Sequence, residues 1–321
     1  MLFSVYIRCK QLWHRAGGVR RRVRRALGDP PKRAVRVFPH AIPKRIWMYW
    51  DQGEAAAPPL VLRCIRSWRE MNPGWSVTVL DATTAPSAVA LPALPKTLLP
   101  AHYADVLRTR LLAEHGGVWA DATTFCARPL DPWLPMVAGQ SGFFAFSWIP
   151  GDRAFLGGGL SRTIGNWFLA SAPGGAVIAA WDRQTVAYWT GRQQTADYFW
   201  HNDAFEWVVA TDRAARRAWA RTPRFGALAP HLAWHRLEAE DLKQHRLEAE
   251  DLKQHQLEAE EPTEPRLDAE EAVARAAAVE AAIATGAILV HKFSWRMPQP
   301  VSEIEALVAP KRQSLDGAQE A

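Results

Sequence analysis

The chain lacks the features that mark small disulfide-bonded, zinc-binding or membrane-spanning proteins. Its 321 residues include only three cysteines, Cys9, Cys64 and Cys126, which are odd in number and far apart. Such spacing forms neither a zinc pattern nor a disulfide framework, and it suits a reducing compartment. No apolar run is long enough to cross a bilayer, and no small-residue cleavage site follows an apolar core as in a signal peptide. We therefore expect a cytoplasmic globular protein.

Established phosphate-binding fingerprints are also missing. The glycines at Gly157–Gly159 could cradle a phosphate, but no Lys-Ser/Thr pair follows them as in a P-loop, and no dinucleotide fingerprint is present. We favour a flexible loop or an edge strand for this segment.

Positive charge is concentrated at the N-terminus. Residues 1–36 hold eleven Lys/Arg against one acid, Asp29, whereas the whole chain carries only +6, so the remainder carries −4. The body of the protein therefore has no charge signature of nucleic-acid binding. The basic segment would suit an amphipathic helix on an anionic membrane, at the inner face of the plasma membrane. The alternatives are a solvated tail, or translation from a start codon upstream of the true domain.

Apolar segments are plentiful, with 48% hydrophobic residues and 16 tryptophans. Surplus tryptophan most often packs in a core, but indole also stacks on sugars and bases. Alternating strand-like and helix-like segments predict a βαβ unit and a mostly parallel sheet. The expected strands are Ile46–Trp50, Trp75–Leu80, Val118–Ala120, Phe143–Phe146 and Ala287–Val290; the expected helices are Leu60–Met71, Tyr103 to the Gly116-Gly117 pair, Ala176–Trp189 and Asp197–Val209.

The stretch Tyr103–Leu130 is the candidate centre of the fold. Its helix should end at Gly116-Gly117, because glycine readily adopts the positive φ of a helix terminus, and a short strand should then deliver Asp121 at its carboxyl end. Asp105 and Arg108 are three residues apart and so point off one helix face together. Ligands of open α/β sheets bind beyond the carboxyl ends of strands. These residues therefore form a candidate ligand site.

A ten-residue repeat occupies 235–260 and reads HRLEAEDLKQ twice, then HQLEAE. Ten residues leave a leucine stripe roughly 80° out of register per copy, so the leucines spiral around a helix. We expect a solvated insertion, and its histidines, His235, His245 and His255, do not converge on a metal.

In this order, the segments resemble the capsular polysaccharide synthesis family of bacterial glycosyltransferases, which is related to the DXD-containing sugar transferases of the GT-A fold. The resemblance extends over most of residues 41–296. It rests on IPKRIWMYW with the following Gln-Gly, PLVLRCIRSWREMNPGW, YADVLRTRLLAEHGGVWADAT, SRTIGNWFLASAPG, DYFWHNDAF and HKFSW. It implies an α/β, GT-A-like nucleotide-sugar-binding core with a mostly parallel sheet flanked by helices. The expected division is an N-terminal arm 1–36, a core 37–234, an insertion 235–265, a completing helix and strand 266–300, and a tail 301–321.

The resemblance assigns donor-binding roles to residues near the first strand and on the central helix. Trp47 and Trp50 would stack on the nucleotide base, although core packing is the alternative for each, and Gln52 joins the substrate-binding set. Asp105 and Arg108 would hold the donor sugar, with Arg108 reaching its diphosphate; an ordinary helix-surface ion pair is the alternative.

Asp121 matches the first acid of the family's metal motif, but Asp121-Ala122-Thr123 replaces Asp-X-Asp. One carboxylate can suffice for Mn²⁺ or Mg²⁺, because substrate phosphates and water fill the remaining positions. His291 could be a further metal ligand or a structural histidine, and Lys292 could neutralise phosphate.

The resemblance implies transfer of a hexosyl group from a nucleotide-diphosphate sugar, with a UDP-sugar as the first candidate, to a glycan or lipid-linked acceptor. Asp197 is the candidate acceptor-side carboxylate or else a helix cap, and Asn166 either binds substrate or starts a helix. Two other functions remain open: a non-catalytic sugar-nucleotide-binding scaffold of a polysaccharide assembly complex, and a nucleotide-sugar hydrolase.

Overall fold

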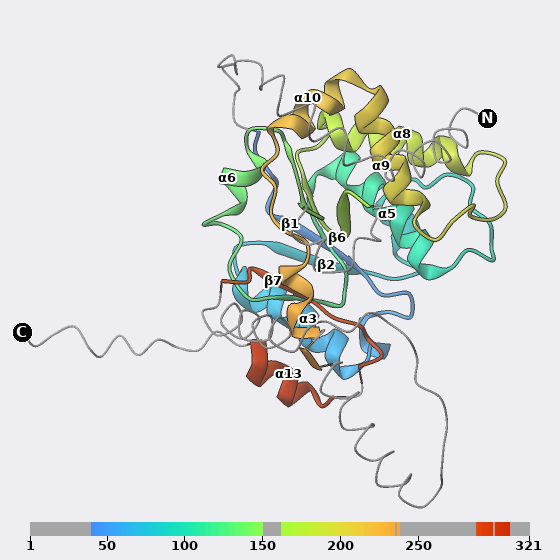
Figure 1. Cartoon of the computed structure of the whole chain (residues 1–321). Coiled ribbons are helices and arrows are strands. Elements are labelled where there is room, and N and C mark those ends of the chain that lie inside the picture. Colours follow the sequence, from blue (N-terminus) through green and yellow to red (C-terminus); the bar gives the residue numbers. More distant parts are fainter. Residues whose placement is uncertain (1–39, 150–161, 235, 238–286, 298, 309–321) are drawn as a thin grey trace, which may run out of the picture. The chain divides into compact units, whose positions relative to one another are not determined.

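The computed structural model describes residues 40–149, 162–234, 236–237, 287–297 and 299–308 (Figure 1). The chain forms two compact units, and neither is a continuous stretch of sequence. Among the described residues, the first unit comprises those up to Ala56, Gly74–Asp121 and Asp131–Ala227, and the second comprises Ala57–Pro73, Ala122–Leu130 and those from Leu228 onward. The chain therefore passes repeatedly between units, where the sequence predicted one continuous core over 37–234.

The first unit is built on a five-stranded sheet with the order β2-β1-β3-β6-β5. Its strands are β1 (Arg45–Tyr49), β2 (Ser76–Leu80), β3 (Gly117–Ala120), β5 (Phe143–Ser147) and β6 (Ile164–Ser171). β1 pairs in parallel with β2 and β3, β6 is antiparallel to β3, and β5 is antiparallel to β6. Every strand except β6 therefore runs in one direction, which confirms the predicted α/β class with a mostly parallel sheet.

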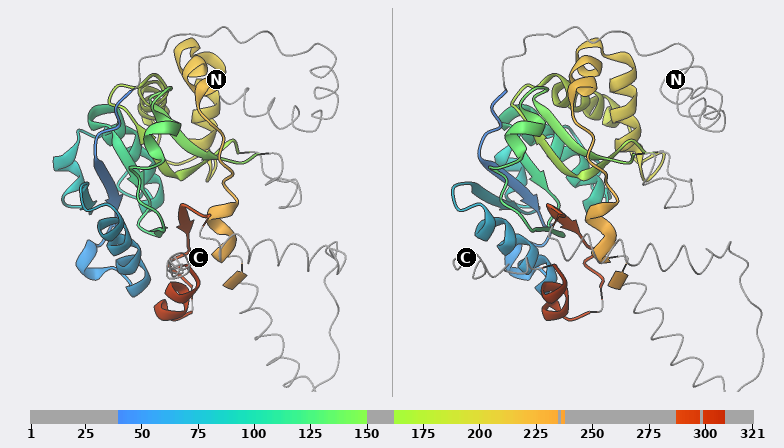
Figure 2. Two further views of the ribbon diagram at one scale, coloured as in Figure 1. Left: turned by 90° about the vertical axis from the view of Figure 1, so that its left-hand side faces the viewer. Right: turned by 60° about the vertical axis from the view of Figure 1, so that its left-hand side comes forward.

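Helices flank this sheet, as Figures 1 and 2 show. The longer ones are α5 (Pro100–His115), α8 (Ala176–Trp189), α9 (Trp200–Thr211) and α10 (Arg213–Arg221), and the short ones are η1 (Glu54–Ala56), α4 (Ala85–Ala88) and α6 (Leu134–Ala138). α8 packs against α5, α9 and α10. The segment Ile164–Ser171, to which the sequence analysis assigned no strand, is the antiparallel strand β6.

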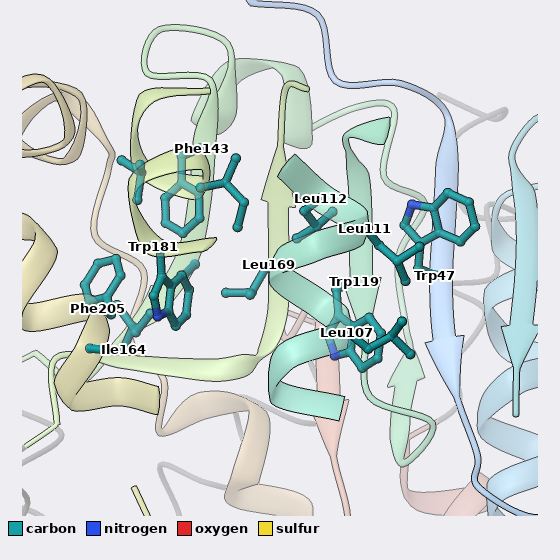
Figure 3. Close-up of a cluster of buried hydrophobic side chains, with 14 of the residues drawn as sticks. Trp47, Leu107, Leu111, Leu112, Trp119, Phe143, Ile164, Leu169, Trp181 and Phe205 are labelled. Atoms are coloured by element: carbon teal, nitrogen blue, oxygen red, sulfur yellow. The ribbon is translucent and has the colours of Figure 1, made fainter. Parts of the chain in front are cut away.

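The core of the first unit is rich in aromatic and leucine side chains (Figure 3). Leu107, Leu111 and Leu112 of α5 are fully buried, and they share a cluster with Trp119 and Leu169 of the sheet and with Trp181 of α8. Burial of such side chains contributes roughly 1.5–3 kcal/mol each relative to exposure. α5 also buries polar residues, and these form the site described below.

Two glycines end α5 and begin β3. Gly116 has φ 65° and Gly117 has φ 99°, conformations that side chains other than glycine rarely adopt. A Cβ at Gly117 would lie 2.6 Å from the carbonyl oxygen of Arg45 on the neighbouring strand. Both positions therefore require glycine, and the sharp reversal places Asp121 at the carboxyl end of β3 as predicted.

The second unit contains α3 (Pro59–Met71), β4 (Thr124–Cys126), η2 (Ala229–His231), β7 (Val290–Lys292) and α13 (Val301–Val308). β4 and β7 pair antiparallel, and the indole N–H of Trp68 on α3 donates to the carbonyl oxygen of Thr124 at 2.8 Å. The last strand begins at Val290, later than expected. The expected tail over 301–321 contains α13, whose Ile304 is buried against α3.

Some predictions lie outside the described residues, namely the N-terminal arm, the Gly157–Gly159 loop, the decapeptide insertion beyond Leu237 and the completing helix expected after residue 266. Within the described part of the chain, no helix combines the length and apolarity needed to cross a membrane.

Candidate active site

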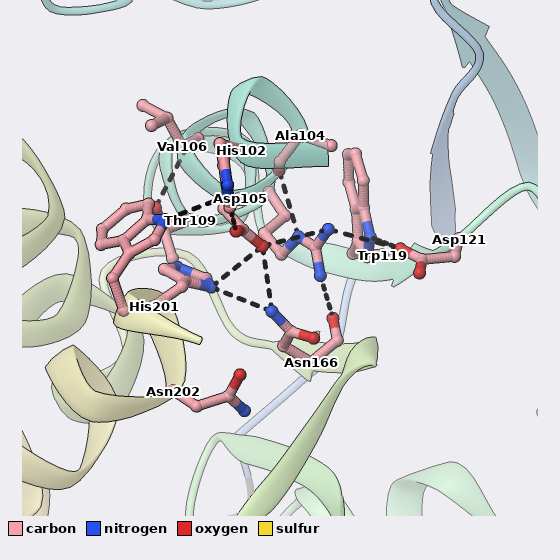
Figure 4. A network of polar contacts seen from close by, with 12 residues as sticks. His102, Ala104, Asp105, Val106, Thr109, Trp119, Asp121, Asn166, His201 and Asn202 are labelled. Carbon is pink, nitrogen blue, oxygen red and sulfur yellow. Dashed lines mark hydrogen bonds and ion pairs between the residues drawn. The ribbon is translucent and has the colours of Figure 1, made fainter. Parts of the chain in front are cut away.

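The carboxylate of Asp105, on α5, is the centre of a buried polar network (Figure 4). Its Oδ1 accepts a hydrogen bond from Asn166 Nδ2 at 2.9 Å. The same oxygen lies 3.3 Å from Arg108 Nη2 and 3.4 Å from His201 Nδ1. One buried carboxylate thus contacts side chains of α5, β6 and α9, which are distant in sequence.

Arg108 links this carboxylate to Asp121. Its Nε donates to the carbonyl oxygen of Ala104 at 3.1 Å, and its Nη1 donates to that of Asn166 at 2.6 Å. Its Nη2 lies 3.3 Å from Asp105 Oδ1 and 3.5 Å from Asp121 Oδ1, and the guanidinium is 5.1 Å from the ring centre of Trp119. A buried cation needs such partners because loss of hydration is otherwise uncompensated.

Asp121 is where the network reaches solvent, with a quarter of its side chain exposed. Its Oδ1 accepts a hydrogen bond from the indole N–H of Trp119 at 2.9 Å, and its backbone N–H donates to the carbonyl oxygen of Trp167 at 2.9 Å. Arg108 and Trp119 therefore fix the orientation of a partly exposed carboxylate at the carboxyl end of a strand.

Electrostatics keep Asp105 ionised and His201 neutral at neutral pH. Burial by itself would raise the pKa of the Asp105 carboxyl, but Arg108, and then His201, offset it and hold this pKa well below its ordinary value. Burial lowers the pKa of His201, and attraction to Asp105 only partly opposes this effect. Nδ1 of His201 lies 3.4 Å from Asp105 Oδ1 and 3.2 Å from Asn166 Nδ2, between an acceptor and a donor.

His102, one turn before Asp105, has a defined tautomer. The indole N–H of Trp200 donates to His102 Nδ1 at 3.2 Å, and an indole nitrogen is only a donor. Nδ1 of His102 therefore acts as the acceptor and the ring proton belongs on Nε2. The 3.5 Å approach of this Nδ1 to Asp105 Oδ2 is consequently a close contact without a shared proton.

Two further aspartates follow the parallel strands β1 and β2 of the same sheet. Asp51, after β1, accepts a hydrogen bond from the Tyr49 hydroxyl at 2.6 Å. Asp81, after β2, accepts bonds from Thr83 and Thr84, which lower the pKa of its carboxyl to about 2. Asp81 therefore stabilises its own turn, whereas Asp51 stands beside a tyrosine at the carboxyl edge of the sheet.

In the second unit, His291 on β7 is buried between the rings of Phe125 and Phe293, at 6.4 and 6.1 Å. Burial lowers the pKa of His291 to about 4, so its imidazole is neutral at neutral pH. Its Nδ1 has no hydrogen-bond partner among the described residues. A neutral imidazole with an unpartnered nitrogen has the chemistry of a metal ligand. The adjacent Lys292 donates to the Thr123 hydroxyl.

Comparison with known proteins identifies the family. The family model described as "Capsular polysaccharide synthesis protein" matches residues 35–258, more than half of the chain. The chain belongs to the capsular polysaccharide synthesis family. This confirms the resemblance inferred from the sequence.

Curated relatives of this family member include proteins named as glycosyltransferases. "O-glycosyltransferase braB" of Annulohypoxylon truncatum is 26% identical over 147 residues, which cover 39% of this chain and 35% of the relative. "Glycosyltransferase afumC" of Aspergillus fumigatus is 25% identical over 175 residues, covering 49% and 44%. The chain thus spans less than half the length of these relatives. The solved structure titled "PaToxG Glycosyltransferase" aligns over 57% of this chain and 80% of its own, with 12% identity and a TM-score of 0.38.

The residues near β1 that the family resemblance assigned to the nucleotide occupy different environments. Trp47 is buried, and its indole N–H donates to the carbonyl oxygen of Gly116 at 3.0 Å, an environment that matches the core-packing alternative. Trp50 is partly buried just after β1, and Gln52 is exposed in the turn that follows. Of the three, Gln52 is the most accessible to a ligand.

Two other assigned residues have local partners. Asp197 is exposed, and its Oδ1 accepts a hydrogen bond from the backbone N–H of Phe199 in the turn before α9. The N-cap of α9 is Phe199, so the alternative that Asp197 caps this helix is wrong. Asn166 lies in β6 and bonds to Asp105, so the alternative that it starts a helix is wrong. Asp105 and Arg108 are likewise buried, so the alternative of a surface ion pair is wrong.

The sequence analysis did not select His102 or His201 as candidate site residues. A signal for His201 was present, because it is spaced by four and seven residues from Phe205 and Val208, and such spacing places all three on one helix face. For His102 no comparable signal exists, since its position depends on Trp200, 98 residues later.

The donor set for a metal is sparse. Among the described residues, no group of three or more His, Cys, Asp or Glu side chains is arranged to hold a metal ion. Ala122 and Thr123, both buried, follow Asp121 where the related transferases have a second carboxylate. Asp121 and His291 belong to different units, so their pairing at one metal stays a prediction.

Proposed function

We propose that this protein is a glycosyltransferase that moves a hexosyl group from a nucleotide-diphosphate sugar to a glycan or lipid-linked acceptor in surface polysaccharide synthesis. A UDP-sugar is the first candidate for the donor. The observation that carries the proposal is the oriented Asp121 carboxylate at the carboxyl end of β3, backed by Arg108 and Asp105. Ligand crevices of α/β sheets open at this edge, and the curated relatives bear glycosyltransferase names.

In the proposed reaction, an acceptor hydroxyl oxygen forms a bond to the anomeric carbon and gives up its proton. The bond from that carbon to the diphosphate oxygen breaks, and the nucleoside diphosphate leaves with the electron pair. Negative charge thus grows on the leaving group. Asp121 would hold a divalent ion, Mn²⁺ or Mg²⁺, which would supply positive charge near the leaving group. Lys292 and His291 remain candidates for contacts to the same phosphates or metal.

Arg108 supports this chemistry by positioning Asp121. Its N–H groups already point to Ala104, Asn166, Asp105 and Asp121, so turning it toward a ligand would break bonds in a buried site. Its charge orients the Asp121 carboxylate and offsets the second negative charge at Asp105. Asp105 and Asn166 would then hold Arg108 in place without contacting the donor sugar themselves, whereas the family resemblance implied direct contacts to the substrate.

The acceptor side is proposed near Asp197. Tyr198 and Phe199, which follow it, are 59% and 39% exposed, an uncommon state for two adjacent aromatic side chains. The guanidinium of Arg162 lies 4.0 Å from the ring centre of Phe199. Exposed aromatic faces suit the C–H faces of a sugar ring, and Asp197 is the carboxylate beside them.

Release of nucleoside diphosphate from a panel of sugar nucleotides, with Mn²⁺ or Mg²⁺, tests the proposal. We expect the protein to use one donor. We expect Asp121→Ala, or a chelator, to lower the rate of nucleoside-diphosphate release at least about a hundredfold, because loss of one electrostatic contact to a developing charge has an effect of this size. Asp131→Asn, at an exposed aspartate paired with Lys44, is the matched control and should retain activity. Unchanged release in Asp121→Ala would overturn the assignment of Asp121.

A second candidate function is a sugar-nucleotide-binding scaffold of a polysaccharide assembly complex. The observation that favours it is the pair Ala122 and Thr123, which offers no second carboxylate. Saturable sugar-nucleotide binding without turnover, unaffected by chelator, would support it. Release of free sugar regardless of the acceptor offered would indicate a hydrolase.

A further inference from the structure

Helix α10 presents a face composed of arginines. Asp212 caps the helix by accepting a hydrogen bond from the backbone N–H of Ala215 at 2.9 Å. Ala215, Ala218 and Trp219 are buried. The arginines at positions 213, 216, 217 and 221 are all exposed, and at about 100° per residue they lie within one side of the helix, opposite the buried residues. α10 is thus anchored by one face and offers the other to solvent.

Among the described residues, this arginine face has no acidic partner. Lys44, Arg110 and Arg183 of the same unit each pair with an aspartate. By contrast, within the part of the chain that the structure describes, Arg213, Arg216, Arg217 and Arg221 make no ion pair. Arg224, beyond the helix end, lies instead against the buried Trp219, with its guanidinium 3.3 Å from the ring centre. Like charges held together without acids repel one another, so an anionic partner would relieve the repulsion.

We propose that the arginine face of α10 docks on an anionic lipid surface. Its charges, spread over about 12 Å of the helix between Arg213 and Arg221, match a planar array of phosphates better than a single small anion. Every cation in the row is arginine, whose planar guanidinium binds phosphate through two parallel hydrogen bonds. The helix contributes no apolar face to the membrane because that face packs on α8 and α9. Contact is therefore electrostatic and sensitive to salt.

This inference does not depend on the proposed enzymatic activity, because α10 contributes no residue to the Asp105–Arg108–Asp121 network. α10 lies beside α8 and α9 in the views of Figures 1 and 2. The basic segment 1–36 could add to membrane attraction, so the experiment must keep that segment unchanged in every variant.

Co-sedimentation of the full chain with vesicles tests the inference. The vesicles contain phosphatidylcholine alone, or phosphatidylcholine with about one-third phosphatidylserine, at about 0.1 M salt, where charge is screened beyond about 10 Å. The test variant is Arg213→Gln/Arg217→Gln/Arg221→Gln. The control, Arg66→Gln/Lys96→Gln/Arg296→Gln, removes the same charge from exposed positions elsewhere. Thermal unfolding of each variant verifies that it is folded.

We expect the wild type to bind only the phosphatidylserine vesicles. Each arginine near such a surface changes the partition coefficient about fivefold, so the α10 variant should bind about a hundredfold more weakly, whereas the control should stay within about fivefold of the wild type. Equal losses in both variants would show diffuse charge attraction and overturn the inference. An absence of wild-type binding would also overturn the inference. An α10-dependent affinity for a duplex oligonucleotide that exceeds the affinity for vesicles at the same salt would overturn it as well.

Discussion

Arg108 and the arginines of α10 are the same residue type in opposite surroundings. Arg108 is 4% exposed, and its guanidinium is directed by two carbonyl oxygens and two carboxylates. Arg213, Arg217 and Arg221 are exposed, and the described residues provide no carboxylate for them. An interior charge must have its partners built into the fold because dehydration is costly, whereas a surface charge can remain in water until a ligand arrives. The first arrangement serves positioning and the second serves binding.

Removing the buried arginine should give the largest change in stability. Arg108→Met leaves Asp105 as a buried carboxylate without its main counter-charge, and we expect the free energy of unfolding to fall by about 3–5 kcal/mol. The matched surface change, Arg217→Met, should alter it by less than about 0.5 kcal/mol. Urea unfolding of both variants measures the difference. Similar losses in the two would contradict the distinction between interior and surface arginines.

Asn166 tests whether the network needs a neutral donor opposite Asp105. Asn166→Ala removes a hydrogen bond to an ionised group, so we expect a loss of about 1.5–3 kcal/mol in unfolding free energy. Asn166→Asp should destabilise further, because it sets a second carboxylate at the position that now donates to Asp105 at 2.9 Å. If Asn166→Asp proves as stable as the wild type, the amide is not the donor that the structure shows.

His201 makes the buried network sensitive to pH. Its pKa is lowered on folding, so between the unfolded value near 6.5 and the lower folded value the unfolded chain binds the extra proton. Unfolding free energy should therefore decline as pH falls below about 6.5. His201→Asn keeps an N–H near Asp105 but does not titrate, and the decline between pH 7 and pH 5 should become shallower. Chemical denaturation at a series of pH values measures both slopes; parallel slopes would exclude His201 as the source.

The smallest effect on stability is expected on the arginine face itself. Arg213→Gln/Arg217→Gln/Arg221→Gln should change the free energy of unfolding by less than about 0.5 kcal/mol, because these exposed side chains make no ion pair with any described residue. Relief of repulsion could make the change slightly favourable. Denaturant midpoints compare this variant with the wild type, and a loss of several kcal/mol would show that the face is structural.

Much of the central motif was predictable because its signals are local. Apolar spacing indicated α5, paired glycines indicated its end, and a short apolar run indicated β3 with Asp121 after it. β4 was harder, since a three-residue strand contains too little pattern to recognise and exists only by pairing with β7. The last strand was expected at Ala287–Val290, but β7 spans Val290–Lys292, because pairing with β4 sets its bounds. The segment expected as a tail contains α13, which is short and whose burial depends on α3.

The sequence by itself determined the α/β class, the glycine reversal and the position of Asp121 at a strand end, since these follow from helical spacing and backbone conformation within a few residues. Only the tertiary structure decided that Asp105 and Arg108 are buried, that Asn166 and His201 complete their shell, and that the α10 arginines have no ion-pair partner among the described residues. The buried network depends on contacts such as that between Asp105 and Asn166, which are 61 residues apart. Such contacts leave no local pattern, because burial and dehydration are properties of the packed molecule.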